Sequence, residues 1–477
     1  MLTCQNLERK MSVYKKACLG LILPLGIALL MLVIFLATAV AQFPHSPPLP
    51  PTGSQPNIIF IIVDAVRADH LSAYGYAQAT SPHLDAQLAA QGAIFTQATA
   101  PSAWTFPSNA GLFTGLRPSS LGVQWSASGT AIPDEATMLA EYLHQDGYYT
   151  AGFISAHYVR GQFGFNQGYD VYQELVGNAG TTTDAEAINS LAIDWIETTW
   201  APVLSGTQPL FLHLYYYDPH TWYNPPAPYD TLYDSTYTGT VTGEVYGDGQ
   251  NIVDGIIVPN ERDIEHIQAL YDGEITYWDT ALGEMLDYLD SNGFLANSII
   301  VLTSDHGQMF GEHGLWIHRN SLYEELLRVP LLVRYNGVIS PGLVITTPIQ
   351  TMDVMPTLLE LANIPIPPNL ESSSLMPLLT GESMTETWPV FSELNALRGD
   401  WISPEFEMRA VRQGDWKYIH QIGPVNANEL YRLQPDSLYE TDNLILTELE
   451  QTELLWQLLD DAYHLPTPQV YLPLTVR

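Results

Sequence analysis

The chain contains the run Asn57-Ile58-Ile59-Phe60-Ile61-Ile62-Val63, which is followed directly by Asp64. An uninterrupted apolar run of this length is typical of a strand that is buried on both faces of a parallel sheet. Similar runs at 209–217 and 298–303 alternate with segments of helical periodicity at 184–200 and 262–292. This alternation predicts a doubly wound α/β fold.

Polar side chains follow each of these apolar runs. Asp64 follows the first, Asp218 and His220 follow the second, and Asp305 and His306 follow the third. Open α/β sheets place their ligands at the carboxyl ends of strands, so these residues are candidates for a common site. Two carboxylates and an imidazole can hold a divalent cation. The alternative is that Asp64 only caps a helix or turn.

A candidate nucleophile lies at the start of a predicted helix, in the segment TFPSNAGLFTG at 105–115. A bound cation would lower the pKa of the Thr105 hydroxyl, which is otherwise a poor nucleophile at neutral pH. The oxygen could then attack phosphorus or sulfur and form a covalent ester. His220 or His318 could protonate the leaving group. The alternative is that Thr105 or Ser108 only caps the helix.

Charge and composition limit the classes of ligand that the chain could bind. The 477 residues carry a formal net charge of -35, and after Lys16 the only lysine is Lys417. This composition excludes a basic surface for nucleic acid and implies that an anionic substrate needs a bound cation. Both cysteines, Cys4 and Cys18, precede the predicted globular region, so a thiolate metal site is not expected there.

The N-terminus predicts export. Basic residues at positions 9, 10, 15 and 16 precede the apolar segment 17–41, and no further Lys or Arg occurs before Arg67. By the positive-inside rule the remainder is extracytoplasmic. The length of the segment favours a retained membrane anchor, whereas Ala39-Val40-Ala41 resembles a cleavage site, so residues 1–41 are either a signal anchor or a signal peptide. A proline-rich linker follows at 42–55.

The amino-acid composition changes in the C-terminal part of the chain. A Pro/Ser-rich stretch begins near residue 366, short strand-like segments follow, and a helix is predicted near 444–463. We expect a small α+β subdomain at 366–464 and a tail at 465–477. The segment 221–261 has no clear period and is predicted to be a long loop, either a substrate rim or a surface insertion.

Several ordered blocks resemble the sulfatase family of the alkaline phosphatase superfamily. They include PNIIFIIVDAVRADHLSAYGY (56–76), TFPSNAGLFTG (105–115), YYYDPHTWYNPPAPY (215–229) and IIVLTSDHGQMFGEHGLWIH (299–318). The resemblance implies an alkaline-phosphatase-like fold with a mixed, mostly parallel central sheet, a catalytic domain at 56–365 and a divalent metal site. It assigns metal ligands to Asp64, Asp305 and His306 and the nucleophile to Thr105, whose oxygen we also expect to coordinate the cation. His220 and His318 match positions that contact the ester group or the leaving oxygen.

The departures from the family pattern affect the expected chemistry. Thr105 occupies the position of the cysteine or serine that becomes formylglycine, and a threonine cannot be converted in this way. Asn109 replaces an arginine, Ala65 replaces the second aspartate of a pair, and His318 replaces a lysine. No formylglycine is therefore expected, and a threonine nucleophile resembles the phosphodiesterase, phosphonoacetate hydrolase and phosphoethanolamine transferase branches of the superfamily.

Some alternatives stay open at this stage. Asp218, His220 and His318 could hold a second metal ion, and calcium, magnesium, manganese and zinc are all compatible with the ligands. The expected substrate is an anionic ester of a small molecule, a lipid head group or a glycan. Besides a hydrolase, the chain could be a membrane-anchored transferase of a phospho group or a non-catalytic binding protein with the same fold.

Overall fold

A computed structural model of the chain describes residues 55–123, 130–176, 184–201, 208–243, 251–382, 388–396, 406–422, 427–433 and 439–465. The predicted signal segment 1–41, the linker up to residue 54 and the tail from residue 466 lie outside these ranges. Within them, no helix combines the length and the apolar character that crossing a membrane requires.

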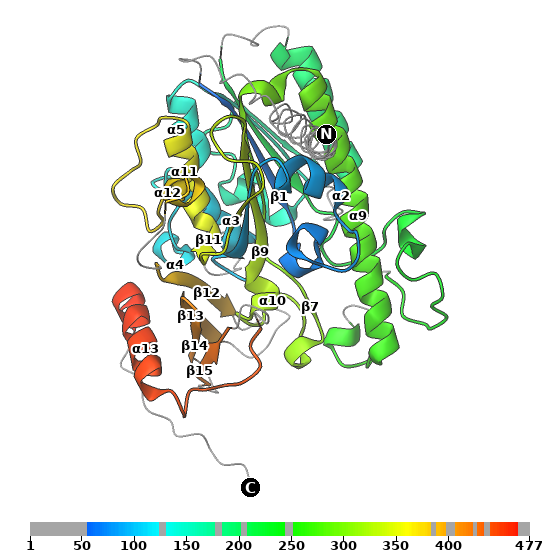
Figure 1. The fold of residues 1–477 in the computed structure, drawn as a ribbon, viewed down its shortest axis with the longest axis vertical. Coiled ribbons are helices and arrows are strands. Elements are labelled where there is room, and N and C mark those ends of the chain that lie inside the picture. Colours follow the sequence, from blue (N-terminus) through cyan, green and yellow to red (C-terminus); the bar gives the residue numbers. More distant parts are fainter. Residues whose placement is uncertain are drawn as a thin grey trace, which may run out of the picture. The chain divides into compact units, whose positions relative to one another are not determined.

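A nine-stranded sheet forms the centre of the fold (Figure 1). Its strand order is β10-β2-β9-β6-β1-β5-β3-β4, and β11 also pairs with β2. Only β9 runs antiparallel to its neighbours, β2 and β6, so the sheet is mixed and mostly parallel, as expected. The strands are β1 (Asn57–Val63), β2 (Ala93–Thr99), β3 (Tyr149–Ile154), β4 (Val171–Glu174), β5 (Leu210–Tyr216), β6 (Ser298–Ser304), β9 (Arg328–Tyr335), β10 (Leu343–Ile345) and β11 (Ile349–Gln350).

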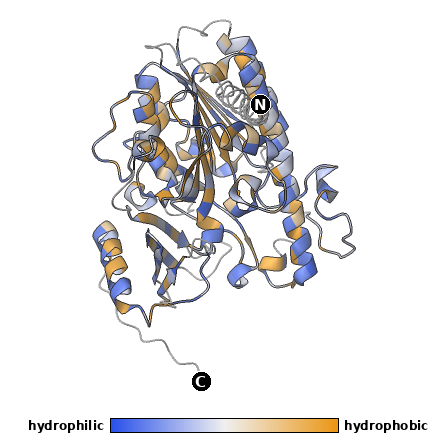
Figure 2. Cartoon of the chain, viewed as in Figure 1, coloured by the Kyte–Doolittle hydropathy of each residue, from blue (hydrophilic) through white to orange (hydrophobic). Residues whose placement is uncertain are grey.

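The central strand β1 is buried on both faces. Ile58, Phe60 and Ile62 join one apolar core, while Ile59 and Ile61 join a second core on the other side. This alternation follows from the two-residue repeat of a strand and explains why the whole run is apolar. Figure 2 shows apolar residues gathered in the strands of the central sheet.

Helices cover the two faces of the sheet. The first core includes side chains of α3 (Thr105–Thr114), α5 (Leu139–Gln145) and α11 (Val354–Leu361), and the second includes side chains of α6 (Ala185–Trp195) and α9 (Glu261–Ser291). The start of α9 is fixed by Asn260, whose side chain accepts from the backbone N–H groups of Arg262 and Asp263. Shorter helices are α2 (Pro82–Leu84), α4 (Pro118–Leu121), α10 (Glu324–Leu327) and α12 (Met376–Leu379).

A four-stranded antiparallel sheet with one helix forms the C-terminal subdomain, in the order β12-β13-β14-β15. Val411, Tyr418 and Leu430 of this sheet form a small core with Leu455 and Leu459 of the final helix. The elements of this subdomain are β12 (Val390–Ala396), β13 (Phe406–Gln413), β14 (Trp416–Ile422), β15 (Glu429–Arg432) and α13 (Leu449–Tyr463). Outside it, β7 (Met309–Phe310) and β8 (Trp316–Ile317) form a separate two-stranded hairpin.

Candidate active site

The site begins where two neighbouring parallel strands end. β1 pairs with β6 so that Val63 lies beside Ser304, and Asp64 and Asp305 are therefore the next residues on adjacent strands. Asp64 and Asp305 are buried, and His306, the residue after Asp305, has no exposed surface. The backbone N–H of Ala65 donates to Asp305 Oδ1 at 3.3 Å, which joins the two strand ends. The predicted convergence of these three residues at one sheet edge is thus observed.

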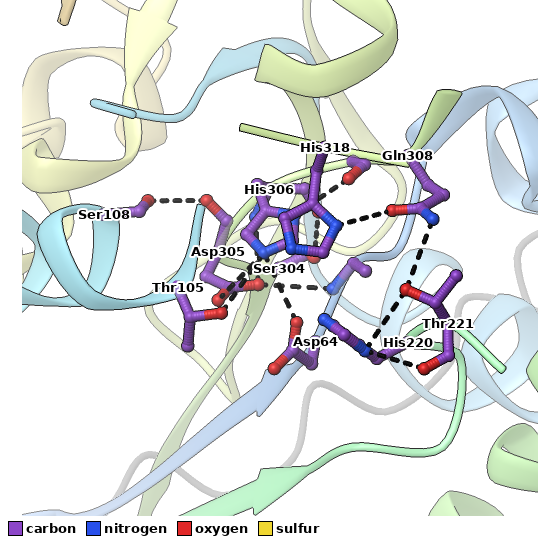
Figure 3. A network of polar contacts seen from close by, with 12 residues as sticks. Asp64, Thr105, Ser108, His220, Thr221, Ser304, Asp305, His306, Gln308 and His318 are labelled. Carbon is purple, nitrogen blue, oxygen red and sulfur yellow. Dashed lines mark hydrogen bonds and ion pairs between the residues drawn. The ribbon is translucent and has the colours of Figure 1, made fainter. Parts of the chain in front are cut away.

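The N-terminus of α3 brings Thr105 to the same edge. Asn109 donates through Nδ2 to Asp305 Oδ2 at 3.1 Å and to the Thr105 carbonyl at 2.8 Å. Ser108 donates through Oγ to the Asp305 carbonyl at 2.5 Å. These bonds fix the first turn of the helix against the end of β6. As a result, Thr105 Oγ1 lies 3.3 Å from His306 Nε2 (Figure 3).

The Tyr215 hydroxyl links the carboxylates of Asp64 and Asp305, and the sequence did not indicate this role. Its hydroxyl lies 2.8 Å from Asp305 Oδ2 and 3.1 Å from Asp64 Oδ2. A phenol carries one proton, so it donates to one carboxylate at a time. Tyr215 stands within the buried strand β5, opposite Ile62 of β1, and only the pairing register reveals that it reaches the site.

The remaining donor atoms fit a divalent cation. Asp64 Oδ1 is buried and finds no hydrogen-bond partner among the described residues, and it lies 3.5 Å from His306 Nε2. Burial, then the Asp305 charge, raises the pKa of Asp64 well above its usual value, whereas the Tyr215 hydrogen bond lowers it. Ligand atoms of Asp64, Asp305 and His306 lie within 4.8 Å of one another. A positive charge placed between them would stabilise the ionised carboxylates.

The hydrogen bonds of His306 fix its orientation and tautomer. Its Nδ1 lies 2.8 Å from the carbonyl of Gly307. A carbonyl oxygen can only accept, so Nδ1 carries the proton and Nε2 presents its lone pair to Asp64 and Thr105. This backbone partner is the kind of group that commonly orients a metal-bound histidine. His306 is therefore prepared to act as a nitrogen ligand.

His220 and His318 complete a cluster of three imidazoles. The ring centroid of His318 lies 4.5 Å from that of His306 and 4.9 Å from that of His220. Nδ1 of His220 donates to the Thr221 carbonyl at 3.0 Å, and Nδ1 of His318 lies 2.9 Å from Gln308 Oε1. Burial lowers the pKa of His220 to about 3 and that of His318 well below its usual value, so both rings rest in the neutral form.

Asp218 does not join these histidines. Its Oδ1 accepts from the backbone N–H of Ala185, the first residue of α6, at 3.0 Å. Among the described residues, the ligand atoms of Asp218, His220 and His318 do not form a group of metal-binding size. The candidate cation site at the strand ends therefore consists of Asp64, Asp305 and His306, whereas Asp218 faces a separate cavity.

Two further polar residues near the site have structural partners. Arg67 is buried and pairs with Asp69 at 2.8 Å and with Glu312 at 2.6 Å, so its guanidinium is held by carboxylates of the chain itself. His313 lies 3.4 Å from a Glu325 carboxylate oxygen, outside the imidazole cluster.

Comparisons with known proteins agree with this geometry. The family model described as Sulfatase matches residues 56–364, and a model described as N-sulphoglucosamine sulphohydrolase, C-terminal, matches residues 311–464. A choline-sulfatase of Rhizobium meliloti (strain 1021) is 35% identical over 196 residues, which cover 40% of this chain and 34% of the relative. An arylsulfatase of Clostridium perfringens (strain 13 / Type A) is 28% identical over 391 residues, which cover 70% of this chain and 80% of the relative.

Two solved structures share the fold. One is a protein in complex with its substrate D-glucosamine-2-N,6-O-disulfate, with a TM-score of 0.70 and 22% identity, covering 86% of this chain and 97% of that protein. The other is the phosphonate monoester hydrolase of Agrobacterium radiobacter, with a TM-score of 0.68 and 21% identity. The match covers 88% of this chain and 98% of that hydrolase. Because the Sulfatase model matches residues 56–364, more than half of this chain, the chain belongs to the sulfatase family.

Proposed function

We propose that the chain is an extracytoplasmic, metal-dependent ester hydrolase in which Thr105 is the nucleophile. One observation carries this proposal: Thr105 Oγ1 and Asp64 Oδ1 lie 3.3 Å and 3.5 Å from the same atom, His306 Nε2. The hydroxyl and the cation ligands therefore converge on one point. A divalent cation held by Asp64, Thr105, Asp305 and His306 would supply the positive charge that acidifies a hydroxyl and neutralises an anionic ester.

The proposed reaction has two displacements. In the first, Thr105 Oγ1 forms a bond to phosphorus or sulfur while the bond from that atom to the alcohol oxygen breaks. The hydroxyl proton leaves Thr105 and ends on the alcohol, which departs. In the second, water attacks the covalent ester, the phosphorus or sulfur acid is released with any substituent it still carries, and the Thr105 hydroxyl regains a proton.

His220 and His318 are suited to move that proton. Both donate through Nδ1, so each has a bare Nε2 that can accept a proton and pass it to the leaving oxygen. Their lowered pKa values describe the cluster without an anionic ester. A bound phosphate or sulfate would stabilise the protonated rings and raise both pKa values towards neutrality.

We further propose that phosphoric and phosphonic esters are favoured over sulfuric esters. Thr105 cannot supply formylglycine, and Asn109 and Ala65 replace an arginine and an aspartate of the family pattern. Asn109 instead bonds Asp305 and the Thr105 carbonyl. A phosphonate monoester hydrolase shares the fold, whereas the curated relatives are named as sulfatases, so both ester classes belong in the test.

The experiment is a panel of 4-nitrophenyl phosphate, phosphodiester, phosphonate and sulfate esters, measured with Mn²⁺, Zn²⁺, Ca²⁺ and Mg²⁺. We expect turnover that depends on added metal, is lost in Thr105→Ala and is partly kept in Thr105→Ser. Unchanged turnover in Thr105→Ala with saturating metal would overturn the proposal. Inclusion of alcohol acceptors in the same assay separates hydrolysis from transfer, because a transferase would form a new ester instead of the free phosphorus or sulfur acid.

A further inference from the structure

A cavity of about 540 Å³ adjoins the imidazole cluster. Its wall is formed by the segment after β5, the N-terminus of α6 and the middle of α9. His220 belongs to both places, because it lines the cavity while its ring centroid lies 6.3 Å from that of His306. In Figure 3, His220 and Thr221 lie on the opposite side of the cluster from Ser108. The cavity therefore lies beside His220, one of the two side chains proposed above to protonate the leaving alcohol.

The cavity is acidic. Its described lining residues include neither lysine nor arginine, and they contribute four carboxylates: Asp184, Glu186, Asp218 and Glu274. Asp218 Oδ2 is buried and has no hydrogen-bond partner among the described residues. The Glu274 side chain accepts one bond, from the backbone N–H of Asn224 at 2.8 Å. These unsatisfied acceptor positions favour a positively charged ligand.

The arrangement of the carboxylates does not suit a metal ion. Ligand atoms of Asp218 and Glu274 do not belong to any group of metal-binding size among the described residues. The acidic groups surround a space instead of converging on a point. Burial, then the charge of Asp218, raises the pKa of Glu274 to about 9, so the ligand-free cavity holds a proton that a bound cation would displace. A cation of molecular size fits this arrangement.

The same cavity is rich in aromatic side chains, namely those of Tyr217, Trp222, Tyr229 and Tyr277. Tyr217 stacks on His220 with ring centroids 4.4 Å apart, and Tyr229 packs near Tyr277 at 5.5 Å. Aromatic faces attract ammonium groups through the ring quadrupole, most strongly when the cation is desolvated. Aromatic rings combined with carboxylates form the usual surroundings of an organic ammonium group.

On the basis of the hydrolase function proposed above, we propose that this cavity binds a positively charged ammonium or amino group in the alcohol half of the ester substrate. The shared chemistry covers two sources, a small ammonium alcohol and an amino sugar. In both, the ester is cleaved at Thr105 while the cation lies between the carboxylates and the aromatic rings beside His220.

The test compares esters that differ only in charge. Choline phosphate and choline sulfate are paired with the 3,3-dimethylbutyl esters, which have the same shape without the charge, and glucosamine 6-esters are paired with their N-acetyl forms. We expect kcat/KM to be about tenfold or more higher for the cationic member of at least one pair. The pair that shows the preference identifies the source of the ammonium group.

Variants of the cavity then locate the effect. Glu274→Gln and Glu186→Gln should each reduce the ratio of cationic to neutral turnover, whereas Glu284→Gln, an exposed residue on the same helix α9, should leave this ratio unchanged. Glu186 is exposed, so its replacement keeps the fold even if the Glu274 variant is poorly stable. Equal turnover of both members of every pair would overturn the inference while leaving the hydrolase function intact.

A binding measurement separates the inference from the proposed function. Calorimetry with choline and with 3,3-dimethylbutanol reports on the cavity without any turnover. Tighter binding of choline, reduced in Glu274→Gln, supports the ammonium site even if no ester is hydrolysed, and equal or undetectable binding of both alcohols counts against it. Absence of turnover across all esters, with choline bound, would refute the hydrolase function alone.

Discussion

Replacement of Tyr215 by phenylalanine removes a hydroxyl that lies between the two site carboxylates. The phenol oxygen is 2.8 Å from Asp305 Oδ2 and 3.1 Å from Asp64 Oδ2. A hydrogen bond to a charged group contributes about 1.5–3 kcal/mol. Loss of a partner that orients metal ligands typically reduces metal affinity about 10–100-fold. We therefore expect Tyr215→Phe to weaken Mn²⁺ or Zn²⁺ binding by about 10–100-fold while the ring keeps its packing.

Calorimetric titration of the metal into chelator-treated protein measures this effect. Tyr216→Phe is the matched control, because the adjacent hydroxyl donates to Asn189 Oδ1 at 2.7 Å, and successive residues of a strand point to opposite faces. The control should bind metal as the parent protein does. The assignment of Tyr215 would be refuted if its variant bound metal within about twofold of the parent, or if both variants lost affinity equally.

Three further predictions concern stability. Lys417 contacts the buried carboxylates of Glu324 and Glu440 at 2.7 and 2.6 Å, so Lys417→Met should lower the free energy of unfolding by about 3–5 kcal/mol in urea titrations; a loss below about 1 kcal/mol would contradict a buried ion pair. Burial raises the pKa of Glu274 in the folded protein to about 9, above its value in the unfolded chain. Between about pH 4.5 and pH 9, Glu274 therefore ionises in the unfolded chain before it does so in the folded protein, and the free energy of unfolding of the ligand-free protein falls as pH rises. Glu274→Gln should therefore be neutral at pH 5 but raise the melting temperature at pH 8, and equal effects at both values would oppose this. Asp64→Asn removes one of two adjacent buried acids, so it should raise the melting temperature of the metal-free protein and abolish the metal-induced rise in melting temperature; a retained rise would exclude Asp64 as a ligand.

The central strands and long helices could be predicted closely because burial leaves a clear pattern. The expected strands at 209–217 and 298–303 correspond to β5 and β6, and the expected helix at 262–292 corresponds to α9. A fully buried strand must be apolar throughout, and a helix covering a sheet must be apolar at helical spacing. These constraints act on each segment separately, so the sequence alone reveals them.

Short elements could not be predicted in this way. β4 has the sequence VYQE, with half-buried or exposed side chains, and β7 and β8 contain two residues each. Such segments become strands because a neighbouring backbone offers hydrogen bonds. Their existence depends on tertiary pairing, which leaves no apolar run to recognise.

The same distinction applies to the site. Asp64 and Asp305 could be predicted because they directly follow strands that pair in parallel. Tyr215 could not, since it lies inside an apolar run and its role depends on the register of β5 against β1. The ligand atoms of Asp218, His220 and His318 do not form a group of metal-binding size among the described residues, because Asp218 accepts from the start of α6. Residues beyond a strand end are placed by loop geometry, which periodicity does not describe.

The most direct test of the central claim is to trap the covalent ester. Metal-loaded protein is mixed with its best 4-nitrophenyl ester, quenched in acid during turnover and digested, and the peptide containing residues 105–115 is analysed by fragmentation mass spectrometry. We expect a phosphoryl, phosphonyl or sulfuryl group on Thr105 that is absent from Thr105→Ala. A label on Ser102 or Ser108 instead, or burst-free turnover that persists in Thr105→Ala, would contradict it.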